Sequence, residues 1–198
     1  MAQSIRKLVS KIDSSVNWVI PYKTSVVEAR YVRRNPNYIS AYLSSQNGCK
    51  MACKFCWLTA SKQVTFEQVD IPTFVSQLEH VLNHAQTVDV DEEKRKNVRI
   101  NINMMSRGEA LANKFIVNQY PNFYESLQNL IKEKGYGNMK MNISTIMPNT
   151  VRNHDLTDIF GSVGNNIYNT NLYYSLYSVK DNSEKSGYQM QCLGKQLF

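Results

Sequence analysis

The chain has 198 residues, of which 42% are hydrophobic and 20% charged, and it carries a formal net charge of +7. This length is sufficient for one domain with a hydrophobic core, and the composition is ordinary for a globular protein. No apolar run approaches the length that crosses a bilayer, and residues 1–7 lack the apolar core of a secretion signal. We therefore expect a cytoplasmic protein with no membrane partner, whose excess of lysine and arginine suits a polyanion such as RNA.

Residues 1–24 form a basic segment, with four lysines and arginines against a single aspartate. Leu8, Val9 and Ile12 have the spacing of one short amphipathic turn. We expect a solvated, partly helical arm over these residues. A dedicated RNA contact is the alternative.

The next two segments have the composition of β-strands. Residues 26–34 and 38–43 are rich in β-branched and aromatic side chains, and Asn35-Pro36-Asn37 between them is a turn signal. This pattern predicts a hairpin that leads into the loop that follows.

That loop, residues 44–56, contains three of the four cysteines, Cys49, Cys53 and Cys56, in the spacing C-x3-C-x2-C. Thiolates bind soft metals and iron–sulfur clusters. Three cysteines hold three irons of a [4Fe–4S] cluster and leave the fourth iron open to a substrate or cofactor, much as a catalytic zinc keeps an open position. The spacing therefore favours chemistry at the fourth iron over simple electron transfer.

Two other interpretations of the cysteines stay open. A structural zinc site requires a histidine as the fourth ligand, and the candidates His80, His84 and His154 form no compact motif with the cysteines. His80 and His84 lie four residues apart, but Glu79 precedes the first histidine, whereas the zinc-protease motif has its glutamate after it. We expect these two histidines to lie on a polar helix face. Disulfides are disfavoured in a reducing compartment.

Helical and strand patterns alternate over the following hundred residues, which is typical of βα units and a parallel sheet. Pro72 and Pro121 each precede apolar residues at helical spacing, and Gly135 has the position of a left-handed cap. The charged run 89–96 is expected to be a solvated loop. Strands are predicted at 98–104, 139–144 and 172–178, and a short helix at 151–160.

The cysteine motif, with Phe55 between the second and third cysteines and Ser-Ser-Gln-x-Gly before Cys49, resembles the radical S-adenosylmethionine (SAM) enzymes. It is similar to the dual-specificity 23S rRNA/tRNA adenine-C2 methyltransferase family and its C8-methylating relative. The resemblance implies a [4Fe–4S] cluster on the three cysteines, SAM chelated by the open iron, and reductive cleavage of SAM to a 5′-deoxyadenosyl radical. It also implies an α/β fold, a partial (β/α) barrel of about four βα units over residues 25–182. Residues 183–198 do not match.

The same resemblance implies further SAM contacts at the ends of the strands. Gly108-Glu109 matches the Gly-Glu motif, although Ser106, Arg107 and Ala110 differ from the residues that the family has at these positions. The remaining positions carried over are Phe55 near the adenine, Ser144 in the Ser-Thr motif, Ser175 and Tyr177 in the Ser-Leu-His motif, and Asp181.

The resemblance corresponds only to the N-terminal part of the proteins in this family. Two further strands and a methyl-carrying cysteine are expected after the match, and Cys192 in the tail is not equated with that cysteine. We therefore expect a truncated or split protein whose barrel is completed by a second polypeptide or by a second copy of this chain. The expected function is RNA adenine methylation on rRNA or tRNA with an electron donor. The alternatives are a silent fragment that binds RNA or a partner, and a radical SAM enzyme of another reaction type.

Overall fold

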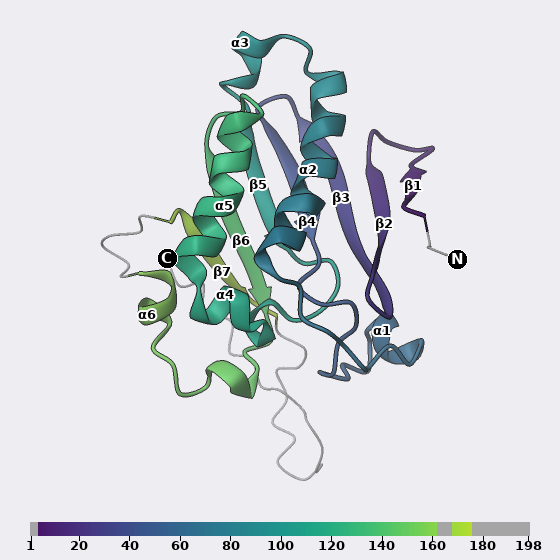
Figure 1. Ribbon diagram of the computed structural model, residues 1–198, viewed down its shortest axis with the longest axis vertical. Coiled ribbons are helices and arrows are strands. Elements are labelled where there is room, and N and C mark those ends of the chain that lie inside the picture. Colours follow the sequence, from purple (N-terminus) through teal and green to yellow (C-terminus); the bar gives the residue numbers. More distant parts are fainter. Residues whose placement is uncertain (1–3, 162–167, 176–198) are drawn as a thin grey trace.

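Seven strands form one mixed sheet in the computed structural model, which describes residues 4–161 and 168–175 (Figure 1). The order of the strands in the sheet is their order in the chain, β1 to β7. The first four strands pair antiparallel and β4 to β7 pair parallel. The predicted α/β class is therefore confirmed. Within the described residues the sheet is open, so the number of barrel units stays a prediction.

The antiparallel part consists of β1 (Arg6–Val9), β2 (Val16–Tyr22), β3 (Ser25–Asn35) and β4 (Tyr38–Leu43). The predicted hairpin of the last two strands is confirmed, with Asn35 paired with Tyr38 across its turn.

The partly helical arm expected over residues 1–24 is wrong, because residues 6–9 and 16–22 are strands. Leu8 and Ile12 are exposed, at 51% and 98%, and form no amphipathic turn. Trp18 is buried at 5% exposure and pairs with Ala29 of β3. A full strand of sheet hydrogen bonds with alternating buried residues stabilises this segment more than one isolated helical turn does, because such a turn has a costly nucleus.

The parallel part adds β5 (Arg99–Met104), β6 (Met139–Thr145) and β7 (Thr170–Tyr174). Two long helices connect these strands, α2 (Ile71–Val88) and α5 (Tyr120–Glu133), and both begin with a proline in the first turn, as predicted. The shorter helices are α1 (Trp57–Ala60), α3 (Glu92–Arg95), α4 (Lys114–Asn118) and α6 (Leu156–Phe160), and the 3-10 turns are η1 (Ala110–Ala112) and η2 (Asn149–Val151).

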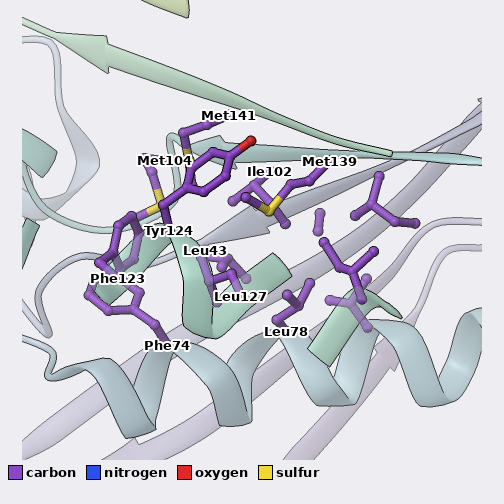
Figure 2. Close-up of a cluster of buried hydrophobic side chains, with 14 of the residues drawn as sticks. Leu43, Phe74, Leu78, Ile102, Met104, Phe123, Tyr124, Leu127, Met139 and Met141 are labelled. Atoms are coloured by element: carbon purple, nitrogen blue, oxygen red, sulfur yellow. The ribbon is translucent and has the colours of Figure 1, made fainter. Parts of the chain in front are cut away.

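The core lies between one face of the sheet and the helices α2 and α5 (Figure 1). Alternate residues of each parallel strand point into it, because side chains alternate between the two faces of a strand. Phe74 of α2 meets Phe123 of α5 with ring centroids 4.9 Å apart. Figure 2 shows these rings beside Leu43, Ile102, Met104, Leu127 and Met141.

Helix ends are stabilised locally. The Asp70 carboxylate accepts from the Thr73 N–H at 3.0 Å and caps α2. Gly135 has φ +78 after α5, which is the left-handed conformation predicted for it. Asp91 caps the short helix α3, which occupies part of the charged run expected to be a loop. None of the described helices combines the length and the apolar character that a membrane span requires.

Candidate functional site

The cysteine loop follows β4 at the carboxyl end of the parallel strands, where α1 and the arrowhead of β6 lie at the same end of the sheet (Figure 1). Residues 44–48 are buried. Ser44 exchanges two hydrogen bonds with the buried Gln77 side chain of α2, N–H to Oε1 at 2.9 Å and Nε2 to the Ser44 oxygen at 3.1 Å. The stem of the loop is therefore fixed to the core.

Residues 63–67 close the loop through hydrogen bonds to its first part. The Cys49 N–H donates to the Gln63 oxygen at 3.0 Å, and Asn47 and Glu67 exchange two further hydrogen bonds. Gly48 is required at this closure, because a Cβ on it would lie 2.1 Å from the Thr65 oxygen. The segment that carries the cysteines is thus a closed loop on a rigid base.

Cys49, Cys53 and Cys56 are all half-buried on this loop, and no disulfide joins any two of them. Burial, followed by repulsion from the like charges of Glu109, Cys53 and Cys56, raises the pKa of Cys49 to about 11, although a backbone hydrogen bond from Met51 opposes this. Without a metal the Cys49 thiol stays protonated at neutral pH, so binding of a metal or cluster there releases a proton.

Within residues 4–161 and 168–175, no three His, Cys, Asp or Glu side chains are gathered closely enough to hold one metal ion. The closed four-ligand site of the zinc interpretation is therefore not formed by these residues. An iron–sulfur cubane binds one thiolate at each iron, so its ligands do not have to meet at one point. The three half-buried thiols on one loop are of the ligand type that such a cluster takes.

Gly108 and Glu109 follow β5, next to the cysteine loop. The Arg107 oxygen accepts from the backbone N–H groups of Ser45 at 2.8 Å and Gln46 at 3.2 Å. Gly108 has φ +93, and a Cβ on it would lie 2.7 Å from both the Ser45 Oγ and the Gln46 Cβ. Only glycine allows the two backbones to approach this closely.

The Glu109 side chain is buried at 5% exposure. Its carboxylate accepts from Thr145 Oγ1 at 2.7 Å, the Ile146 N–H at 3.2 Å and the Leu111 N–H at 3.1 Å. Burial raises the pKa of Glu109, which these hydrogen bonds oppose. Among the described residues no lysine, arginine or histidine pairs with it, so the carboxylate has three neutral donors and no cation.

Arg107 joins three parts of the site. In the sequence it was noted only as a difference from the residue that the family has at this position. Its guanidinium donates to Glu28 Oε1 of β3 at 3.1 Å, to the Asn47 oxygen at 2.9 Å and to the Gln63 side chain. Asn113 acts similarly, with its Nδ2 donating to the Ser45 oxygen at 2.7 Å and the Val69 oxygen at 2.9 Å. In the sequence, Asn113 stands at the position that the resemblance expects after Gly108-Glu109, but the partners of both residues lie on other elements and are known only from the fold.

The structure describes some of the other predicted SAM contacts and not the rest. Ser144 is half-buried at the end of β6, and its neighbour Thr145 is the residue that contacts Glu109. Ser175 is exposed, and its N–H donates to the Thr145 oxygen at 2.8 Å, so it lies at the same end of the sheet. Phe55 is 64% exposed on the cysteine loop. Tyr177, Asp181 and Cys192 lie outside the described residues.

The histidines of α2 contact aromatic rings. His84 packs edge-on against Tyr31, with centroids 4.9 Å apart, and His80 stacks on Trp18 at 6.3 Å. Burial, followed by the charge of Lys7, lowers the pKa of His84. The prediction of a polar helix face is therefore wrong, because both half-buried histidines pack against aromatic rings of the sheet.

No family model matches the sequence. The structure is similar to that of a radical SAM methyltransferase from Sphaerobacter thermophilus, with a TM-score of 0.49 and 18% sequence identity. The match covers 71% of this chain and 38% of that protein, so this chain corresponds to well under half of it. At this TM-score the likeness by itself identifies neither the family nor the reaction.

Proposed function

We propose that this chain is a radical SAM protein that binds a [4Fe–4S] cluster through Cys49, Cys53 and Cys56 and binds SAM beside Glu109. One observation carries the proposal: two adjacent parallel strands bring the cysteine loop and the Gly108-Glu109 turn into direct hydrogen-bonded contact. The Glu109 carboxylate is near enough to Cys49 to affect the pKa of its thiol. Neither motif requires the other locally, so their meeting supports a shared ligand.

The state of Glu109 supports SAM as that ligand. The buried carboxylate accepts hydrogen bonds from three neutral donors and has no cation beside it among the described residues. An ammonium group would neutralise its charge through a charge-assisted hydrogen bond. SAM carries an ammonium, and the resemblance places it at this motif. When bound, the cluster supplies the one-electron reduction that cleaves SAM. The chain's own residues orient the ligand, and the buried stem 44–48 limits the access of water on one side.

We further propose RNA as the substrate, with an adenine of rRNA or tRNA as the methyl acceptor. The support is the net charge of +7 together with the likeness of the cysteine and Gly-Glu motifs to the adenine methyltransferases. This reaction also requires an electron donor. A second polypeptide could pair with the edge of β7, which has no neighbouring strand within residues 4–161 and 168–175, because an unpaired strand edge is a site for strand addition.

Anaerobic reconstitution with iron and sulfide tests the cluster. We expect about four irons per chain, because three thiolates with one open iron hold a cubane. Cys53→Ala should abolish iron binding, whereas Met51→Ala, on the same loop but not one of the three proposed cluster ligands, should retain it. A protein that takes up one zinc per chain and no iron would show that the cluster assignment is incorrect.

A further inference from the structure

The face of the parallel sheet opposite α2 and α5 is polar. The residues that alternate with the buried apolar positions of β4 to β7 are asparagines, tyrosines, serines, one lysine and one arginine. No aspartate or glutamate lies among them. A surface of amides, rings and cations without carboxylates suits an electron-rich, anionic or nucleobase-containing ligand.

Three asparagines form a row across this face. Asn103 of β5 pairs with Asn142 of β6, and Asn142 pairs with Asn171 of β7. Tyr42 of β4 pairs with Asn103 and extends the row. Asn103 and Asn142 are 7% and 8% exposed, so both residues are more than nine-tenths buried.

The hydrogen bonds of the row have a direction. Asn103 Nδ2 donates to the Asn101 main-chain oxygen at 3.2 Å, and Asn142 Nδ2 donates to Asn103 Oδ1 at 3.1 Å. A carbonyl oxygen only accepts, so the Asn101 oxygen sets the orientation of both amides. Asn171 turns away from the row and donates its Nδ2 to the Tyr173 hydroxyl at 3.0 Å.

The series ends at Asn142 Oδ1, which is buried and has no hydrogen-bond partner. Buried acceptors are nearly always paired, so this one is suited to a donor from outside the described residues. The row lies close to the end of β6, because Ser144, two residues beyond Asn142 and on the same face, is the last residue on that face of the strand. The next residue, Thr145, turns to the other face and binds Glu109. A molecule held at Glu109 reaches the row by passing over this strand end.

We propose that this asparagine row recognises adenine, with the Asn142 amide as the specificity-determining group. Its Oδ1 accepts from the exocyclic amine, and the second hydrogen of Nδ2 donates to the adjacent ring nitrogen, which is the bidentate pairing of asparagine with adenine. Tyr42, half-buried at one end of the row, offers a ring on which the base can stack. The choice of adenine among amine-bearing ligands rests on the proposed function, and the adenine belongs either to SAM or to the RNA.

Pairs of ligands in which hypoxanthine replaces adenine, so that the exocyclic amine becomes a carbonyl oxygen and N1 carries a hydrogen, test this proposal by equilibrium binding. One arm compares S-adenosylhomocysteine with S-inosylhomocysteine, and the other compares a short single-stranded oligoadenylate with its inosine counterpart. We expect about tenfold tighter binding of the adenine member in one arm, and that arm identifies the source of the base.

Asn142→Leu, which has a similar shape and no polar atoms, should remove the preference, and Asn103→Leu, which removes the partner that orients the amide, should reduce it. Asn122→Leu, on the exposed face of α5, should leave it unchanged.

Equal affinities for both members in both arms, or an unchanged preference in Asn142→Leu, would overturn the proposal. The ligand pairs are compared on the unaltered protein, so the test stands even where a variant fails to fold. Iron content is measured separately. A protein without iron that still prefers adenine contradicts the proposed function alone, and an iron-loaded protein without the preference contradicts the adenine site alone.

Discussion

Replacing Gly108 by alanine should destabilise the protein for two separable reasons. The residue has φ +93, which an L-residue adopts only with strain. The new methyl group would also lie 2.7 Å from the Ser45 Oγ and the Gln46 Cβ and 2.9 Å from the Gln46 nitrogen. The loop stem that it meets is buried and bonded to the core, so it cannot move away freely.

The magnitude follows from these two terms. A left-handed backbone costs an L-residue about 1–2 kcal/mol. Overpacking of a close-packed site costs about 1–3 kcal/mol more. The free energy of unfolding should therefore fall by about 2–5 kcal/mol, a large part of the roughly 5–15 kcal/mol that is typical of a domain.

Urea unfolding followed by circular dichroism measures this loss, and Gly135→Ala is the matched control. Gly135 also has positive φ, +78, but the nearest atom to its added Cβ is Arg95 Nε at 3.8 Å. The control should therefore show the backbone cost alone, about 1–2 kcal/mol. Equal losses in the two variants would refute the claim that close approach of the two loops requires glycine. Iron loading should decrease in Gly108→Ala and remain intact in the control.

Two further predictions concern the neighbours of Gly108. Because the pKa of Glu109 is raised in the folded protein, its contribution to stability is complete below its ordinary pKa of 4.5 and is lost as the pH rises through the folded pKa. Glu109→Gln should remove this part of the pH dependence, which urea unfolding between pH 4 and 7 measures. The same variant should weaken SAM binding by roughly tenfold or more. An unchanged pH profile would contradict the assignment. Arg107→Met should lower the free energy of unfolding by roughly 1.5–3 kcal/mol, because buried hydrogen bonds of a charged group are lost. Lys62→Met should be near neutral, because Lys62 is exposed in the segment after α1, beside the Arg107 partner Gln63.

Elements with strong local signals could be predicted from the sequence. Pro72, Pro121 and Gly135 mark helix ends by their own backbone restrictions, and the alternating residues 99–104 and 139–144 are strands in the structure. The strand β1 could not be predicted, because all four of its residues are exposed and its existence depends on pairing with β2. The apolar residues 8, 9 and 12 matched a helical spacing that no tertiary contact supports.

The residues of the candidate site also fall into two groups, those that short motifs identify and those that only the fold brings together. Cys49, Cys53, Cys56 and Gly108-Glu109 were identified because each belongs to a short motif whose chemistry is local. Arg107 and Thr145 were not, because their partners lie on other strands and only the fold brings them together. The asparagine row depends on the register of three strands, and no single segment of the chain contains it.

The agreement between strand order and chain order has a consequence for synthesis on the ribosome. Each new strand pairs with the strand made just before it, so the sheet can extend one strand at a time as the chain emerges. The candidate site would then be assembled in three successive steps: the cysteine loop after β4, the Gly108-Glu109 turn after β5, and Thr145 at the end of β6. The buried carboxylate of Glu109 receives its side-chain donor only at the last step. Until β6 has emerged, the thiols and the carboxylate are present on a nascent chain whose site is still open to solvent.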